Sequence, residues 1–268
     1  MKLSIIYQDN DIVVVNKPAG ISVHKGIAEK GETLTDWLIE KFPEMKKVGD
    51  LPAGRQVSNL RPGIVHRLDK NTSGVLVAAR NQKSFEFLKN QFSAHSLKLS
   101  KEGRDLAYGG QKREVVKKYL ALVEGNLKND NGVIDLPIGR SRSDFRKKLA
   151  SDSAKGELRE AITEYKILER FADVRHSMSN IGRSYTLVEA YPKTGRMHQI
   201  RVHFKAIGHP IVCDSLYGGK RMTCPFGLAR HFLHANFLEF VSPSGARLKL
   251  EADLPEDLAE VLAGLRKK

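Results

Sequence analysis

One stretch of the sequence, RPGIVHRLDKNTSGVLVAAR from Arg61 to Arg80, places charged and hydroxyl side chains between two apolar runs. Asp69 lies near its centre, with Arg67 and Lys70 close beside it. Neighbouring positive charge keeps a carboxylate ionised, and in that state it can act as a base or a nucleophile. An aspartate in a turn also commonly caps local backbone N–H groups. Asp69 is therefore a candidate catalytic carboxylate, with a structural role in the turn as the alternative.

Two later segments carry side chains that suit the handling of a nucleobase. Tyr119 lies in VKKYLALVEG, a segment typical of a strand. Arg201 lies in TGRMHQIRVH, where its i, i+3 spacing from His198 predicts a shared helical face. Taken singly, a tyrosine on a strand is usually a packing residue and a basic helical face is usually solvated. Beside a carboxylate at the edge of the core, they could hold a base that has left its stack.

Sequence motifs for metals and nucleotide cofactors are missing. The chain has nine histidines, but His198 and His203 are too far apart for one helical face, and no HExxH or CxxC accompanies them. The P-loop, the GxGxxG fingerprint and the GxSxG nucleophile elbow are also missing. We therefore expect no metal and no cofactor.

The charge of the chain indicates a polyanionic partner. It has 45 Lys and Arg against 31 Asp and Glu, a formal net charge of +14. Such an excess favours nucleic acid, because bound phosphates are neutralised and counterions are released. No helix-turn-helix or zinc module supports a DNA-binding protein, which makes that the weakest of the nucleic-acid hypotheses.

The compartment is expected to be the cytoplasm. Two cysteines, Cys213 and Cys224, are too few for a disulfide framework, so buried free thiols in a reducing environment are expected. No run approaches the ~18 apolar residues of a membrane span. The opening residues MKLSIIYQDNDIVVV are typical of strands rather than of a signal peptide.

Apolar patterning predicts an α+β fold. Strands are expected over residues 3–7, 12–16, 75–79, 115–124, 162–168 and 185–191. Helices are expected over residues 33–42 and 197–207, after Asn81 as a cap, and from Asp253 and Pro255 onward. Strict βαβ alternation is missing, so a mixed, largely antiparallel sheet flanked by helices is expected instead of a doubly wound parallel sheet. One domain over residues 1–268 is the simplest division. Residues 51–59 and 93–111 are polar, glycine-bearing and aperiodic, and are expected to be surface insertions.

Four segments, taken together, resemble the RluA-like family of pseudouridine synthases. They are HRLDKNTSG, KKYLALVEG, YPKTGRMHQIRVHF with GHPIVCDSLYG, and RHFLHA. They recur in the order of that family, and the resemblance covers most of the chain from Ile5 to about Val241. The resemblance implies the pseudouridine synthase catalytic fold.

The resemblance also implies roles for four residues. The catalytic aspartate of the family corresponds to Asp69, and the tyrosine that lies against the target base corresponds to Tyr119. The arginine that pairs with the catalytic aspartate corresponds to Arg201. In relatives with bound RNA, the arginine two residues before the aspartate fills the space left by the flipped base, which points to Arg67.

The implied reaction is the isomerisation of uridine in structured RNA, ribosomal or transfer, by an enzyme that needs no cofactor. A monomer is taken as the default oligomeric state. A carboxylate can either trap C1′ covalently or remove a sugar proton. The alternative is a non-catalytic RNA-binding or RNA-folding protein on the same scaffold.

Two departures from the family pattern stand out. Relatives often have Gly-Asp where this chain has Cys213-Asp214, which bears on local packing. Many relatives begin with a small RNA-binding domain, whereas here the strands of the catalytic type begin almost at Met1, so that module is expected to be missing.

Overall fold

A computed structural model describes all of the chain except residues 1–2, 27–30, 51–60, 98–114, 142–143, 145, 151–153, 177–178, 221, 223 and 268. The chain forms two compact units, each built from two separate segments. Unit 1 comprises Met1–Lys117 and Ala235–Asp253, and unit 2 comprises Lys118–His234 and Leu254–Lys268. A single catalytic domain that spans both units stays a prediction.

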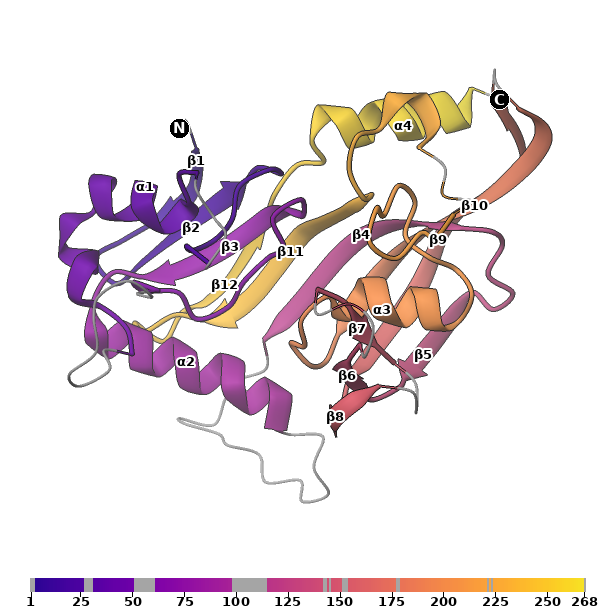
Figure 1. Cartoon of the computed structure of the whole chain (residues 1–268). Coiled ribbons are helices and arrows are strands. Elements are labelled where there is room, and N and C mark those ends of the chain that lie inside the picture. Colours follow the sequence, from indigo (N-terminus) through magenta and orange to yellow (C-terminus); the bar gives the residue numbers. More distant parts are fainter. Residues whose placement is uncertain are drawn as a thin grey trace. The chain divides into compact units, whose positions relative to one another are not determined.

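Unit 1 is a sheet with helices against it (Figure 1). Its strands pair in the order β1 (Ser4–Gln8), β2 (Ile12–Lys17), β3 (Ser73–Ala79), β11 (Leu233–Val241) and β12 (Arg247–Glu251). The β1–β2, β2–β3 and β11–β12 pairs are antiparallel. The helices are α1 (Leu34–Lys41), the short 3₁₀ helix η1 (Pro43–Lys47) and α2 (Gln82–Leu97).

The core of unit 1 forms where α2 meets the sheet. Every residue of β3 is buried, as expected for an unbroken apolar run. Phe85, Leu88 and Phe92 recur at helical spacing on α2 and join the core cluster that contains Val75 and Val77 of β3. These contacts fix the strand that begins four residues after Asp69.

Helix α2 starts where the sequence predicts but ends later. The Asn81 side chain accepts a hydrogen bond from the Ser84 N–H at 2.9 Å, which caps the first turn. The helix continues to Leu97, so the first five residues of the segment 93–111 are helical and not a loop. The rest of that segment, and all of 51–59, lie outside the described residues.

Unit 2 contains a second group of strands (Figure 1). Four of them pair in the order β4 (Val116–Glu124), β10 (Ser179–Pro192), β9 (Ile162–His176) and β5 (Asn131–Asp135), all antiparallel. A small three-stranded sheet is made by β7 (Lys148–Leu149), β6 (Ile138–Arg140) and β8 (Lys155–Arg159). The helices are α3 (Gln199–Ala206), the short η3 (Pro225–Gly227) and α4 (Glu256–Arg266).

Helix α4 has the apolar face that its periodicity predicts. Leu258, Val261, Leu262 and Leu265 are buried on it and pack with the core of unit 2 around Tyr185. The largely antiparallel α+β architecture expected from the sequence is confirmed. In the described part of the chain, no helix has both the length and the apolarity needed to cross a membrane.

Candidate active site

Asp69 lies on a turn at the entrance to β3, as the sequence predicts. The Thr72 N–H donates to the Asp69 carbonyl oxygen at 3.1 Å and closes the turn. The aspartate is half-buried, whereas Leu68 before it is buried. Gly74 follows at the start of the strand with φ +122°, where a Cβ would stand 2.1 Å from the Ala235 carbonyl oxygen. The glycine of the HRLDKNTSG segment is therefore required by the close approach of β11.

A buried lysine braces the turn that carries Asp69. The Lys17 ammonium donates to the carbonyl oxygens of Pro18 and Ile21, both at 2.8 Å, and of Lys70 at 3.1 Å. The Gly20 N–H also donates to the Lys70 carbonyl, at 2.9 Å. A fully buried ammonium needs such partners, because burial of an unpaired charge is costly. The residue next to Asp69 is thereby tied to the end of β2, a contact that sequence reasoning missed.

Three cationic or titratable side chains of unit 1, Arg61, Arg67 and His24, interact with one another, and Arg67 also interacts with Asp69. Arg67 is exposed. Partial desolvation of its guanidinium and the charge of Arg61 lower its pKa, and the charge of Asp69 raises it. The lowering effects are larger, so the pKa of Arg67 lies below its ordinary value. Burial, reinforced by the charges of Arg61 and Arg67, lowers the pKa of His24 to about 4. His24 is thus neutral at pH 7, and Arg61 and Arg67 carry the positive charge. His24, like Lys17, was not among the residues expected from the sequence.

His66, the histidine of the HRLD segment, has a structural role. Its ring stacks on Phe92 with the centroids 4.7 Å apart, and its Nε2 accepts a hydrogen bond from the Val77 N–H at 3.1 Å. Burial, with a smaller effect from the charge of Lys117, lowers the pKa of His66 to about 3. The ring is therefore neutral and fixes the approach of the segment to β3.

In unit 2, Tyr119 lies on β4 opposite Ala190 of β10. Its side chain is half-buried and packs against a core cluster that includes Ala121 and Phe204. The predicted strand position is confirmed. Tyr119 is thus neither fully buried in this core nor fully exposed.

Arg201 forms a buried ion pair with Asp214. Its Nε and Nη2 donate to the two carboxylate oxygens at 2.7 and 2.8 Å. Burial raises the pKa of Asp214, but the bonds and charge of Arg201 and the charge of His231 outweigh it, so the pKa lies below its usual range. Asp214 also accepts from the N–H groups of Leu216 and Tyr217. Asp214 thus organises Arg201, while the expected pairing of Arg201 with Asp69, which would join the two units, stays a prediction.

The expected helical face shared by His198 and Arg201 is wrong. His198 precedes α3 as its N-cap residue, with φ 58° and ψ 20° in the left-handed region. Arg201 and His203 on the helix are buried, so this face is not solvated. The long-range contacts of these side chains, which the local sequence pattern does not contain, override the simple periodicity.

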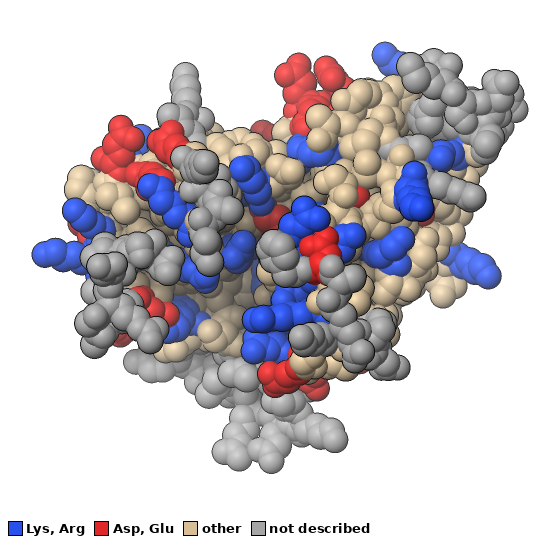
Figure 2. Space-filling view, viewed as in Figure 1, with Lys and Arg blue, Asp and Glu red and all other residues tan. Residues whose placement is uncertain are grey.

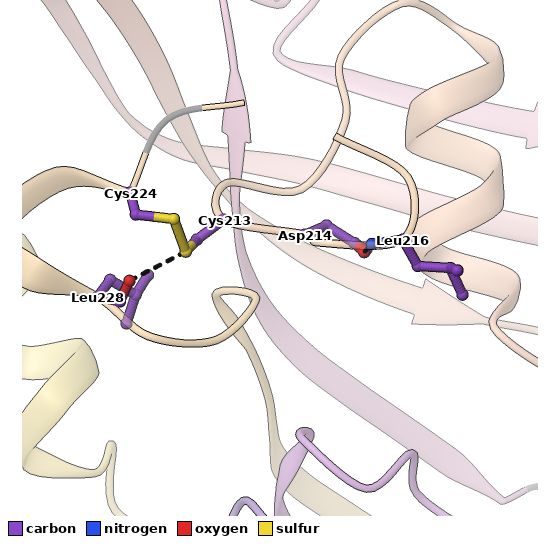
Figure 3. The surroundings of a disulfide bond; sticks show 5 residues. All are labelled: Cys213, Asp214, Leu216, Cys224 and Leu228. Atoms are coloured by element: carbon purple, nitrogen blue, oxygen red, sulfur yellow. Dashed lines mark hydrogen bonds between the residues drawn. A yellow bond between two sulfur atoms is a disulfide. The ribbon is translucent and has the colours of Figure 1, made fainter. Parts of the chain in front are cut away.

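The expectation of free thiols is also wrong. Cys213 and Cys224 form a disulfide, with Cα atoms 4.7 Å apart (Figure 3). The chain doubles back between them, with the Met222 N–H donating to the Gly219 carbonyl oxygen. This return brings together two cysteines that spacing alone leaves unpaired. Cys213 directly precedes Asp214, the partner of Arg201, in the chain, and the Asp214 carboxylate lies toward Leu216 (Figure 3).

The described residues contain no group of three or more His, Cys, Asp or Glu side chains arranged to hold a metal ion. Lysine and arginine side chains occur on the displayed face of each unit, as Figure 2 shows. This distribution agrees with the net charge of +14 and with a phosphate-bearing partner.

Comparison with known proteins assigns these features to one family. The family model described as RNA pseudouridylate synthase matches residues 11–206. The chain is 37% identical over 268 residues to the uncharacterised RNA pseudouridine synthase YlyB of Bacillus subtilis, covering 100% of this chain and 74% of the relative. It is 36% identical to the ribosomal large subunit pseudouridine synthase D of Xanthomonas campestris, covering 98% of this chain and 70% of the relative.

A solved structure gives the same result. The fold is similar to that of the human RNA pseudouridylate synthase domain containing 1, with a TM-score of 0.66 and 25% sequence identity. The match covers 100% of this chain and 96% of the human one. Sequence and fold thus point to the same family.

Proposed function

The chain belongs to the RNA pseudouridylate synthase family, and on that premise we propose that it isomerises uridines in ribosomal RNA with Asp69 as the catalytic carboxylate. The enzyme is an RNA pseudouridine synthase, an isomerase that converts uridine in RNA to pseudouridine. The observation that carries the assignment of Asp69 is its half-buried place on a turn braced by Lys17, beside the charge of Arg67.

The reaction requires a carboxylate that is held in a fixed position. The N1–C1′ bond of the uridine breaks, the uracil turns within the site, and C5 bonds to C1′. C5 then loses its proton to solvent, and N1 gains a proton from solvent. An ionised Asp69 would either bond to C1′ and later leave it, or remove a sugar proton and later return it. In both routes the atoms and electrons balance without an oxidant or a reductant.

The other predicted residues would handle the base and the charge. Tyr119 would offer a flat, half-buried face to the uracil, which must stay free to turn. Arg201 would place its positive charge beside Asp69 and hold that carboxylate ionised. Arg67, exposed on the segment that leads to Asp69, would fill the space that the flipped nucleotide leaves in the RNA. These three roles rest on the family resemblance.

Ribosomal RNA is the proposed substrate because the Xanthomonas relative is named for the ribosomal large subunit. Transfer RNA is the other candidate. The positive charge would neutralise backbone phosphates in either case. We place the activity in the cytoplasm, where both RNAs function, and propose a monomer.

The test is the release of tritium from RNA labelled at uridine C5. Large-subunit ribosomal RNA and transfer RNA, both from a host that lacks this enzyme, are incubated separately with the protein and without a nucleotide cofactor. We expect release from the ribosomal RNA. Release from transfer RNA alone would overturn the proposed substrate, and tight binding of both RNAs without any release would favour the non-catalytic RNA-binding hypothesis.

A further inference from the structure

The helix that carries Arg201 begins at an unfavourable residue. His198 occupies the left-handed backbone region, which is unfavourable for an L-residue with a Cβ because the Cβ crowds the following carbonyl oxygen. Its side chain makes no capping hydrogen bond to the helix. Histidine therefore gives the helix neither a good cap nor a relaxed backbone. A non-glycine residue held in this conformation indicates that contacts elsewhere determine it.

Tyr217 makes a contact that holds His198 in this conformation. The His198 Nδ1 lies 2.9 Å from the Tyr217 hydroxyl oxygen, and the two rings meet edge to face with centroids 5.7 Å apart. The Lys148 N–H donates to the same hydroxyl at 2.9 Å. The hydroxyl has one proton to donate, and we assign His198 Nδ1 as the atom that accepts it.

Tyr217 in turn supports the ion pair of Arg201. The Arg201 guanidinium carbon lies 5.1 Å from the centroid of the Tyr217 ring, within cation–π range. The Tyr217 N–H donates to a carboxylate oxygen of Asp214 at 3.1 Å. Tyr217 is itself only 5% exposed, so its ring has little freedom to move away. One tyrosine thus contacts both members of the Arg201–Asp214 pair.

We infer that His198 and Tyr217 are positioning residues that fix the orientation of the Arg201 guanidinium. The hydroxyl bond to His198 stops the Tyr217 ring from shifting, and the ring with Asp214 holds Arg201. A free arginine side chain has many rotamers, so a guanidinium that is already oriented loses less entropy when it meets its target. This inference rests on the proposed role of Arg201 in the reaction. It concerns how the Arg201 guanidinium is oriented before RNA binds.

The test uses variants that separate the hydroxyl, the imidazole and the backbone. Tyr217→Phe removes only the hydroxyl and keeps the ring below Arg201. His198→Gly keeps the left-handed backbone without strain and removes the imidazole. His198→Asn supplies an amide oxygen that can accept the Tyr217 hydroxyl proton, and asparagine tolerates the left-handed backbone conformation. Tyr7→Phe in unit 1, which loses a hydroxyl bonded to Asp9, is the matched control.

The readouts are the single-turnover rate of tritium release and the Kd for RNA. We expect Tyr217→Phe and His198→Gly each to slow the single-turnover step by about three- to tenfold, the range that one hydrogen bond supplies. RNA binding should stay unchanged, and His198→Asn should recover most of the rate. The double variant should be no slower than either single one, because the two residues act as one unit.

Three results would overturn the inference. They are wild-type rates in both single variants, strictly additive losses in the double variant, or losses of RNA binding that match the losses of rate. Arg201→Ala in the same assay distinguishes failure of this inference from failure of the proposed role of Arg201. If it is slow while the positioning variants are fast, only this inference fails. If Arg201→Ala keeps the wild-type rate, the proposed role of Arg201 fails and the inference fails with it.

Discussion

Arg201 and Asp214 form a two-pronged ion pair in which neither side chain is more than 7% exposed. Loss of one member of such a pair leaves the other buried and uncompensated, at a cost of about 3–5 kcal/mol. We therefore expect Asp214→Ala to lower the free energy of unfolding by about that amount. Urea unfolding measures it, and Asp253→Ala, at an exposed aspartate of unit 1, is the control. A loss below about 1 kcal/mol, the range of surface pairs, would contradict the importance of this pair.

Two histidines, the half-buried His66 and the buried His203, should make the fold sensitive to acid. Burial, with Lys117 adding to the effect, lowers the pKa of His66 to about 3. Burial also lowers the pKa of His203 to about 4, although the Leu136 carbonyl and Asp135 oppose the decrease. Both rings bond while neutral, and the His203 Nε2 donates to that carbonyl at 3.0 Å.

The unfolded chain binds these protons at an ordinary histidine pKa near 6.5, so between about pH 6.5 and 4 it carries more protons than the folded chain. The stability that neutral His66 and His203 contribute is complete above pH 6.5 and falls as the pH falls through this window. Titration followed by NMR should show both rings still neutral at pH 5. A midpoint near 6.5 for either would contradict the described burial.

Gly74 should not tolerate a side chain. Alanine there would meet the Ala235 carbonyl oxygen at 2.1 Å and would keep a positive φ. We expect Gly74→Ala to cost about 2–4 kcal/mol of unfolding free energy, from backbone strain together with overpacking. Gly195→Ala is the matched control, because a Cβ at Gly195 meets nothing within 4 Å. Equal melting temperatures for the two variants would contradict the close approach of β11.

The disulfide should stabilise the loop that bears Asp214. Cys224 is exposed, so a dithiol reductant can attack its sulfur and release the Cys213 thiol, while the reductant becomes a disulfide. The Cys213 sulfur lies 3.0 Å from the Leu228 carbonyl oxygen, which would accept a hydrogen bond from that thiol (Figure 3). We expect reduction to lower the free energy of unfolding by about 2–3 kcal/mol.

Melting curves with and without dithiothreitol measure this loss. Cys224→Ser should be insensitive to the reductant and should melt with the reduced wild type. Two thiols titrating in the non-reduced protein would show that the bridge is not formed. Cys213→Gly is a second variant that cannot form the bridge. Because Cys213 has φ 57°, which glycine adopts without cost, this variant loses the bridge without adding backbone strain.

The sequence predicts those features that depend on neighbours along the chain. The turn of Asp69 follows from polar residues between two apolar runs, and the buried face of α4 follows from its leucine spacing. Asn81 as the start of α2 is equally local. In each case a short segment contains all the side chains that decide its structure.

What the sequence does not predict depends on contacts between distant segments. The partner of Arg201 in its buried pair, Asp214, lies beyond the end of α3, and the bridge between Cys213 and Cys224 forms because a loop doubles back. His198 leaves its expected helical face because Tyr217 holds it. The Lys17 ammonium donates a hydrogen bond to the carbonyl oxygen of Lys70, 53 residues away in the sequence. Patterns of three or four residues carry no information about such approaches.

The central claim is that Asp69 carries out the isomerisation, and its most direct test is a comparison of wild type, Asp69→Asn and Asp253→Asn. Each is incubated with RNA labelled with tritium at uridine C5, and tritium release and RNA binding are both measured. We expect release by the wild type and by Asp253→Asn, and none by Asp69→Asn, which should still bind RNA and melt like the wild type. Release by Asp69→Asn at the wild-type rate would show that another group performs the reaction.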